Sequence, residues 1–299
     1  MLRIEPTGQI LGATLRGVDL KQDLAPRDFA AILRALGEFG VLRFPGQWLD
    51  APELKRFSER FGEIQVLRGN PNHEPGIPEV TILSNVKKDG KLIGAPDAGQ
   101  SWHTDMTYSQ TKGFVNVLSA WKVPMRDGKP VGSTEFTNTQ AAAADLGPEM
   151  VARLDGMTAT HDLEMFWEYM RREKGSKRPP MSPEMRAQRP PVSHPVLLRH
   201  PITGRNVLYI NPGFTTHIDG LPPEDSAALL KTLLDHVFQP KYRYVHEWEE
   251  GDLLLWDNLG SWHMARPDYG PEEYRLMKRC QVMADRIFDP AFVREALAA

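Results

Sequence analysis

Short strand-like segments that end at turn residues restrict the fold of this chain more than any other feature of the sequence. Apolar or alternating runs of this kind lie at 41–44, 113–123, 206–210 and 253–256, and each is followed directly by Pro, Asn or Asp. These segments outnumber the predicted helices and lack the regular strand–helix alternation of a parallel sheet. We therefore predict a mostly β chain with flanking helices, whose core is a double-sheet barrel.

Two amphipathic helices are predicted from apolar residues at helical spacing, over about 26–39 and about 223–237. A further helix is expected to begin at Asp50, because Glu53 three positions later completes a capping-box pattern. No linker or internal repeat separates the predicted elements. We therefore expect residues 1–299 to form a single domain.

Composition and charge exclude several classes of partner. The formal net charge of -3 is small for 299 residues, so neither nucleic acid nor an anionic membrane is expected as a partner. The N-terminus lacks the apolar region of a signal peptide, and no apolar run approaches the ~20 residues of a membrane span, which favours a cytoplasmic protein. The single cysteine, Cys280, excludes an intramolecular disulfide framework and any multi-cysteine metal site. Any metal must then be bound by His, Asp or Glu.

A basic segment interrupts the second half of the chain. Between 171 and 189 there are seven Arg or Lys residues and only two Glu, with several prolines among them. We interpret this stretch as part of an insertion at about 165–193 that is either a solvated loop or a lid over an anionic ligand.

His103 and Asp105 are the first candidate metal ligands. In an extended strand the side chains of residues i and i+2 leave the same face, so the two could converge on one point. With one more histidine they would make the facial triad that holds Fe(II) and leaves positions open for reactants. The motif is weak alone, because a second copy stands at His217 and Asp219. There we expect Asp219 to serve turn and helix-approach hydrogen bonds instead.

His263 is the candidate third ligand, because it follows the predicted buried strand 253–256 on a loop rim. The strand after it, 274–282, carries Arg275 and Arg279 on one face. If both point into the barrel, each needs an anion, since a buried unpaired guanidinium is strongly disfavoured. Two separate anionic groups are implied.

The chain resembles the TauD/TfdA family of Fe(II)- and 2-oxoglutarate-dependent dioxygenases over about residues 4–285. The residues that carry the resemblance are His103 and Asp105, Gly132-Ser133-Thr134, Trp256-Asp257-Asn258, His263, and Arg275 with Arg279. It departs from the usual family pattern at Ser133, where relatives carry Asp before the threonine. The resemblance implies that the core is a double-stranded β-helix, the jelly-roll or cupin-like architecture.

The resemblance also implies roles for individual residues. His103, Asp105 and His263 would bind Fe(II), and Thr134 with Arg275 would hold the distal carboxylate of the co-substrate 2-oxoglutarate. The remaining positions would face the primary substrate: Arg279 its anionic group, and Phe214 and Met106 its apolar part. Relatives are often dimers or tetramers, so a homo-oligomer is a further expectation.

The implied reaction consumes O2 and 2-oxoglutarate, yields succinate and CO2, and hydroxylates a C–H bond of a small anionic substrate such as a sulfonate, an aryloxyalkanoate or another carboxylate. Desaturation or oxidative decarboxylation by the same oxidant is the alternative within this class. A hydrolytic zinc site and a non-catalytic jelly-roll protein that binds small anions are alternatives of other classes. The intact ligand set argues against the non-catalytic alternative, and Arg275 argues against the zinc site.

Overall fold

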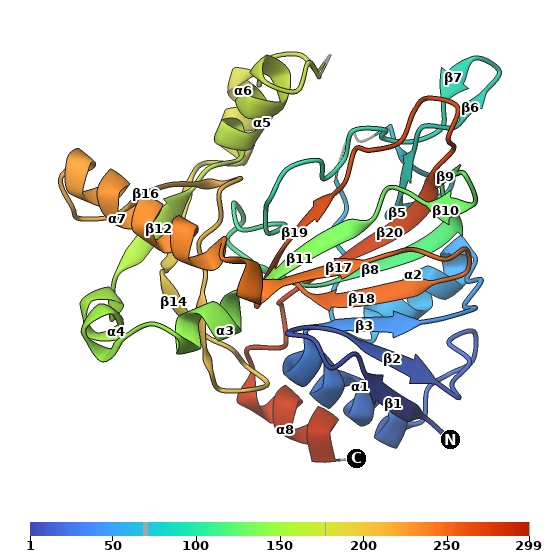
Figure 1. Cartoon of the computed structure of the whole chain (residues 1–299), viewed down its shortest axis with the longest axis horizontal. Coiled ribbons are helices and arrows are strands. Elements are labelled where there is room, and N and C mark those ends of the chain that lie inside the picture. The colour runs from blue at the N-terminus through green and yellow to red at the C-terminus, as the bar shows by residue number, and fades with distance from the viewer. Residues whose placement is uncertain (68–70, 177, 299) are drawn as a thin grey trace.

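The computed structural model describes residues 1–67, 71–176 and 178–298, and it is mostly β with helices around the sheets (Figure 1). The largest sheet has the strand order β1-β2-β3-β18-β8-β20-β5-β4, in which only β2 and β3 run parallel. Its strands are β1 (Arg3–Pro6), β2 (Ala13–Arg16), β3 (Val41–Phe44), β4 (His73–Glu74), β5 (Ile77–Ser84), β8 (Gly113–Lys122), β18 (Leu253–Asp257) and β20 (Leu276–Met283).

A second sheet lies against one face of the first, and helices cover the other face. The second sheet has the order β17-β11-β19, with bounds β11 (Thr134–Asn138), β17 (Arg243–His246) and β19 (Ser261–Ala265). The covering helices are α1 (Pro26–Phe39), α2 (Ala51–Glu59) and α8 (Pro290–Ala298). As a result, the central strands of the large sheet are buried on both faces.

Strand β18 shows why its sequence is a continuous apolar run. Leu253 and Leu255 pack into the cluster beneath α1 and α2, whereas Leu254 and Trp256 pack into the cluster between the two sheets. Side chains alternate along a strand, so a strand with both faces covered must be apolar at every position.

The rest of the chain forms a third layer beside the two sheets. It also includes two short hairpins. This layer contains β12 (Thr158–His161), β13 (Val192–Pro195), β16 (Thr215–Ile218), β14 (Leu197–Arg199), β15 (Asn206–Leu208), α3 (Thr139–Ala144), α4 (Pro148–Leu154) and α7 (Pro223–Val237). The hairpins are β6 (Lys87–Lys88) with β7 (Lys91–Leu92) and β9 (Met125–Arg126) with β10 (Lys129–Pro130), and a 3-10 turn η1 (Pro240–Tyr242) precedes β17.

The helix predictions at 26–39 and 223–237 are confirmed, and so is the capping box at Asp50 and Glu53. The prediction of a loop over the basic segment is wrong in part. α5 (Leu163–Arg172) runs into that segment and α6 (Pro183–Gln188) lies inside it, capped by Ser182 with Pro183 at its first position. The prolines indicated a loop, but one of them starts a helix. Lys177, one of the seven basic residues, lies outside the described residues.

Across the part of the chain that the structure describes, the helices are too short or too polar to cross a membrane.

Candidate active site

The two candidate histidines lie opposite each other in neighbouring chain segments. The N–H of His103 donates to the carbonyl of His263 over 3.1 Å, and the N–H of His263 donates back to the carbonyl of His103 over 2.9 Å. This isolated antiparallel bridge brings their ring centroids to 4.3 Å. Backbone pairing therefore fixes the distance between two residues that are far apart in the sequence.

Asp105 reaches the histidines from a turn. The extended strand predicted over 103–105 is wrong, because only His103 pairs and the chain then turns, with Met106 at φ 61° in the left-handed region. Asn258 holds this turn: its Nδ2 donates to the carbonyl of Asp105 over 2.8 Å and its Oδ1 accepts from the N–H of Asp105 over 3.0 Å. A side-chain clamp, and not strand alternation, directs the carboxylate.

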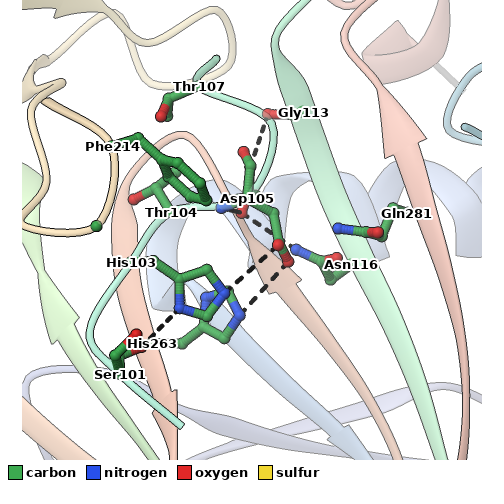
Figure 2. Close-up of polar contacts among 12 residues, drawn as sticks. Ser101, His103, Thr104, Asp105, Thr107, Gly113, Asn116, Phe214, His263 and Gln281 are labelled. Carbon is green, nitrogen blue, oxygen red and sulfur yellow. Dashed lines mark hydrogen bonds and ion pairs between the residues drawn. The ribbon is translucent and has the colours of Figure 1, made fainter. Parts of the chain in front are cut away.

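The three side chains form one compact cluster, and Figure 2 shows both imidazoles directed at the carboxylate. His103 Nε2 lies 3.4 Å from Asp105 Oδ1, and His263 Nε2 lies 3.5 Å from Asp105 Oδ2. One ligand atom of each residue falls within 4.8 Å of the others, and all three side chains are buried. Two imidazole nitrogens and one carboxylate oxygen are the donor set of a facial triad for a divalent metal.

The protonation states suit a metal ligand set. His103 Nδ1 lies 2.7 Å from the carbonyl of Ser101, which can only accept, so in the neutral ring Nδ1 carries the proton and Nε2 keeps its lone pair. Burial and the neighbouring His103 lower the pKa of His263 to about 4. Burial would raise the pKa of Asp105, but Arg279 and the two imidazoles outweigh it and hold that pKa well below its usual value. At neutral pH His263 is neutral and Asp105 is anionic.

A short loop presses against His103 from the side. Asn211 fastens it, since its Oδ1 accepts from the N–H groups of Gly213 and Phe214 while its Nδ2 donates to Thr107 Oγ1 over 3.0 Å. A Cβ on Gly213 would lie only 2.8 Å from His103 Cβ. The glycine is therefore required by the close approach of the loop to a ligand residue.

Aromatic side chains enclose the cluster. The ring of Phe214 stands nearly edge-on to His103 at 6.1 Å, and Phe166 of α5 lies 5.8 Å from His103 and 5.0 Å from Phe214. Tyr108 packs on Phe214 at 4.8 Å. An apolar cavity of about 430 Å³ opens beside this wall; it is lined by Ser101, Trp102, Met165, Tyr169, Pro212, Gly213 and Phe238. Aromatic and apolar side chains therefore line one side of the cluster.

Arg279 differs from expectation. Its Nη1 donates to Asp105 Oδ2 over 3.3 Å and its Nη2 donates to Gln281 Oε1 over 3.0 Å. Asp105 supplies Arg279 with an anion from within the protein, and the expected contact of Arg279 with the anionic group of the substrate stays a prediction. The sequence could not reveal this pairing, since the partners come from distant parts of the chain. The Arg279 Nε remains buried without a hydrogen-bond acceptor among the residues that the structure describes.

Arg275 matches expectation more closely. Its side chain is buried, and among the described residues it has no acidic partner. Burial lowers the pKa of its guanidinium, and contact with Tyr269 opposes that shift. Its Nε is buried with no hydrogen-bond acceptor. A buried guanidinium with an unused donor marks a place where an anionic ligand would be bound.

Thr134 offers a second unused donor. Its buried Oγ1 accepts a hydrogen bond from Trp248 Nε1 over 3.0 Å. Within the described chain the proton of the Thr134 hydroxyl has no acceptor. On the β11–β19 pair, Phe136 lies opposite His263, so Thr134, two residues before Phe136, faces the same side as that histidine.

The second His-x-Asp pair lies apart from this site. The His217 side chain is 56% exposed, and Asp219 accepts from Thr158 Oγ1 at 2.6 Å and Thr160 Oγ1 at 2.7 Å. The expectation of helix-approach bonding by Asp219 is wrong in detail, because those partners lie on β12 across the sheet. Ser226 instead bonds the N–H of Ile218 at the start of α7.

Sequence reasoning missed Asn258 as the clamp on Asp105 and Phe166 as part of the wall. Asn258 belongs to the motif Trp256-Asp257-Asn258, but only its contacts reveal a role for it. Phe166 could have been found from the strong apolar face of α5, which was obscured by the basic residues that follow. Met106 is buried beside Gly113, and its expected contact with substrate stays a prediction.

Comparison with known proteins agrees with this geometry. The family model "Taurine catabolism dioxygenase TauD, TfdA family" matches residues 3–281. The chain belongs to the TauD/TfdA family. It is accordingly a 2-oxoglutarate-dependent dioxygenase that uses Fe(II), 2-oxoglutarate and O2.

Individual members of the TauD/TfdA family match nearly end to end. Pentalenolactone F synthase of Streptomyces arenae is 34% identical over 98% of this chain and 97% of its own. The alpha-ketoglutarate-dependent 2,4-dichlorophenoxyacetate dioxygenase of Burkholderia sp. (strain RASC) is 31% identical over 93% and 92%. The crystal structure of AAD-2 in complex with Mn(II) and N-oxalylglycine superposes with a TM-score of 0.77, at 26% identity over 95% and 98%.

Replacing Gly213 by Ala should disturb the site of this TauD/TfdA protein, because the new methyl group would overlap His103 Cβ. We expect a loss of about 1–3 kcal/mol in unfolding free energy and weaker Mn(II) binding, measured by denaturant unfolding and by calorimetry. Gly147→Ala is the control, since a Cβ added there would meet nothing within 4 Å. Equal effects of the two substitutions would contradict the close-approach argument.

Proposed function

We propose that His103, Asp105 and His263 bind the Fe(II) of this dioxygenase, and that the enzyme oxidises a C–H bond of a small anionic substrate with an apolar body. The observation that carries the proposal is the buried cluster of two imidazoles and one carboxylate within 4.8 Å, beside an aromatic wall. When bound, the metal with 2-oxoglutarate and O2 supplies an oxidant strong enough for an unactivated C–H bond, with succinate and CO2 as by-products.

In this proposal the residues of the chain itself bind 2-oxoglutarate, orient the substrate and exclude water from the site. Thr134 and Arg275 each bury a donor without an acceptor, and we propose that both donate to the distal carboxylate of 2-oxoglutarate. Arg275 can supply a charge-assisted and directional contact, which a neutral hydroxyl complements. The aromatic wall of Phe166, Phe214 and Tyr108 excludes water, which would otherwise react with the oxidant.

The primary substrate is proposed to lie under Phe166 and Phe214, with Met106 at the same site. Arg279 keeps one unpartnered donor, Nε, after pairing with Asp105, and we propose that this group takes the substrate anion. An apolar body with an acidic end is also what the names of relatives describe, among them a 2,4-dichlorophenoxyacetate dioxygenase and an (S)-phenoxypropionate dioxygenase. Hydroxylation is the proposed outcome, and product analysis would separate it from desaturation or decarboxylation.

The segment from α5 through α6 is proposed to act as a lid on a single-domain protein. Phe166 and Met181 take part in the apolar cluster with Phe214, and Arg178 Nη2 pairs with Asp97 at 3.3 Å. We further infer that the two facing sheets are the walls of a double-stranded β-helix. The cytoplasmic location and a homo-oligomer, dimer or tetramer, stay predictions.

Removing a proposed ligand should abolish tight metal binding. His103→Ala and His263→Ala are expected to weaken Mn(II) binding by at least about a hundredfold, because even supporting residues of metal sites contribute ten- to a hundredfold. The measurement is calorimetric titration of the apoprotein. His217→Ala is the matched control and should bind like wild type; metal loss there would move the site to the second His-x-Asp pair.

Arg275→Ala should raise the apparent KM for 2-oxoglutarate by about ten- to a hundredfold, because hydrogen bonds to a charged group contribute about 1.5–3 kcal/mol each. Succinate release at varied 2-oxoglutarate gives the constant. Arg16→Ala, which removes a half-exposed surface partner of Glu5, is the control. An unchanged KM in the Arg275 variant would refute the assignment.

Phe166→Ala should loosen the aromatic wall. With the best substrate from a panel of aryloxyacetates, alkyl sulfates and taurine, we expect a substrate KM about tenfold higher and more succinate formed per product, because apolar contact and water exclusion are both lost. Arg172→Ala on the same helix is the control, since that side chain is 74% exposed and does not line the cavity. Unchanged coupling in the Phe166 variant would favour a purely structural role for α5.

A further inference from the structure

Trp248 makes a hydrogen bond whose acceptor is unusual for a buried indole. Its Nε1 donates to the Thr134 hydroxyl over 3.0 Å, and both side chains are almost completely buried, at 1% and 3% exposure. The buried indole of Trp262, by comparison, donates to the backbone carbonyl of Ile210. At Trp248 the acceptor is a hydroxyl group, which also carries a proton that it can donate to another acceptor.

The chemistry of the two groups fixes where that proton can point. An indole N–H only donates, whereas a threonine hydroxyl has one proton and two lone pairs. Because Trp248 occupies a lone pair, the proton of Thr134 must point away from the indole. Within the described residues it finds no acceptor, although a buried donor normally has one.

Trp248 is itself held firmly. Its ring packs in the cluster between the two sheets with Phe136 and Trp256, and stands edge-on to His246 at 4.7 Å. His246 Nε2 lies 3.4 Å from Asp252, whose other oxygen accepts from Arg43 over 2.8 Å. The indole therefore cannot rotate away from Thr134 without breaking up this packing.

The open side of Thr134 faces the metal-ligand side of the sheet. Thr134 lies two residues from Phe136, which pairs with His263, so Thr134 and His263 share one face of the β11–β19 pair with an offset of about 6.6 Å along the strand direction. The unused Arg275 donor is buried directly before β20, a strand of the other sheet.

We propose that Trp248 is a positioning residue: its N–H fixes the Thr134 hydroxyl as a donor toward the distal carboxylate of 2-oxoglutarate. This inference rests on the proposed function, which assigns that carboxylate to Thr134 and Arg275. Without the indole N–H, the hydroxyl can rotate and the carboxylate loses an oriented donor. The metal ligands would be unaffected.

The test is a double-mutant cycle on equilibrium binding. Calorimetry would measure 2-oxoglutarate binding to the Mn(II)-loaded protein for wild type, Trp248→Phe, Thr134→Val and the double variant. We expect Trp248→Phe to weaken binding about three- to tenfold, as for one neutral hydrogen bond, Thr134→Val to weaken it about tenfold or more, because its hydroxyl bonds a charged carboxylate, and the double variant to be no weaker than Thr134→Val alone. Mn(II) affinity should stay the same throughout.

The control is Trp121→Phe, because Trp121 Nε1 has no hydrogen-bond partner among the described residues and its removal should cost nothing in binding. In turnover, Trp248→Phe should raise the KM for 2-oxoglutarate and leave the KM of the primary substrate unchanged. If Trp248→Phe does not fold, 3-benzothienylalanine at position 248 keeps the ring shape and lacks only the N–H, and the same binding loss is expected.

Three outcomes would overturn the inference. Unchanged binding in the Trp248 variant, with weakened binding in Thr134→Val, would leave Thr134 as a ligand but remove Trp248 from its positioning. Additive losses in the double variant would make the role of Trp248 structural. If wild-type protein with Mn(II) does not bind 2-oxoglutarate, the proposed function itself fails.

Discussion

The clamp of Asn258 on the backbone of Asp105 is the contact on which the rest of the site depends. It binds both the N–H and the carbonyl of one residue and so fixes a turn that has Met106 in the left-handed region. Asn258 directly follows the buried strand β18, so the position of the Asp105 carboxylate is fixed by a rigid strand of the large sheet. The bridge between His103 and His263 then needs only two backbone hydrogen bonds to complete the cluster.

Charge is distributed over the interior in two different ways. Asp105 is compensated within the protein, by Arg279 and the imidazoles, so the anionic ligand persists in a buried place without a metal. Arg275 is not compensated in this way: burial lowers the pKa of its guanidinium, and its Nε has no acceptor. A folded protein tolerates such a charge when a ligand supplies the missing anion. Arg279 is thus paired within the protein, whereas Arg275, directly before β20, keeps a donor without a partner among the described residues.

The cover of the site is built from the part of the chain that looked least structured. α5 presents Phe166 to the cluster on one side, and its outer side carries Glu168 with Arg171, an ion pair at 2.7 Å. α6 follows Pro179 and Pro180, and its Met185 packs against the same apolar cluster as Phe214. Apolar packing inside and charge outside allow a segment rich in Arg and Lys to pack against the aromatic side chains beside the site.

The sequence by itself determined the helices at 26–39 and 223–237 and the capping box at Asp50, and it singled out His103, Asp105, His263 and Arg275 as candidate site residues, because those signals are local or are carried by a resemblance. It did not determine the turn at Asp105, the pairing of Arg279 with Asp105, the packing of Phe166 on His103 or the bond from Trp248 to Thr134. Each of these joins residues distant in the chain, and the distance between such residues is set by sheet order and register. Only the tertiary structure fixes those, and with them which buried donors are satisfied and which are left for a ligand.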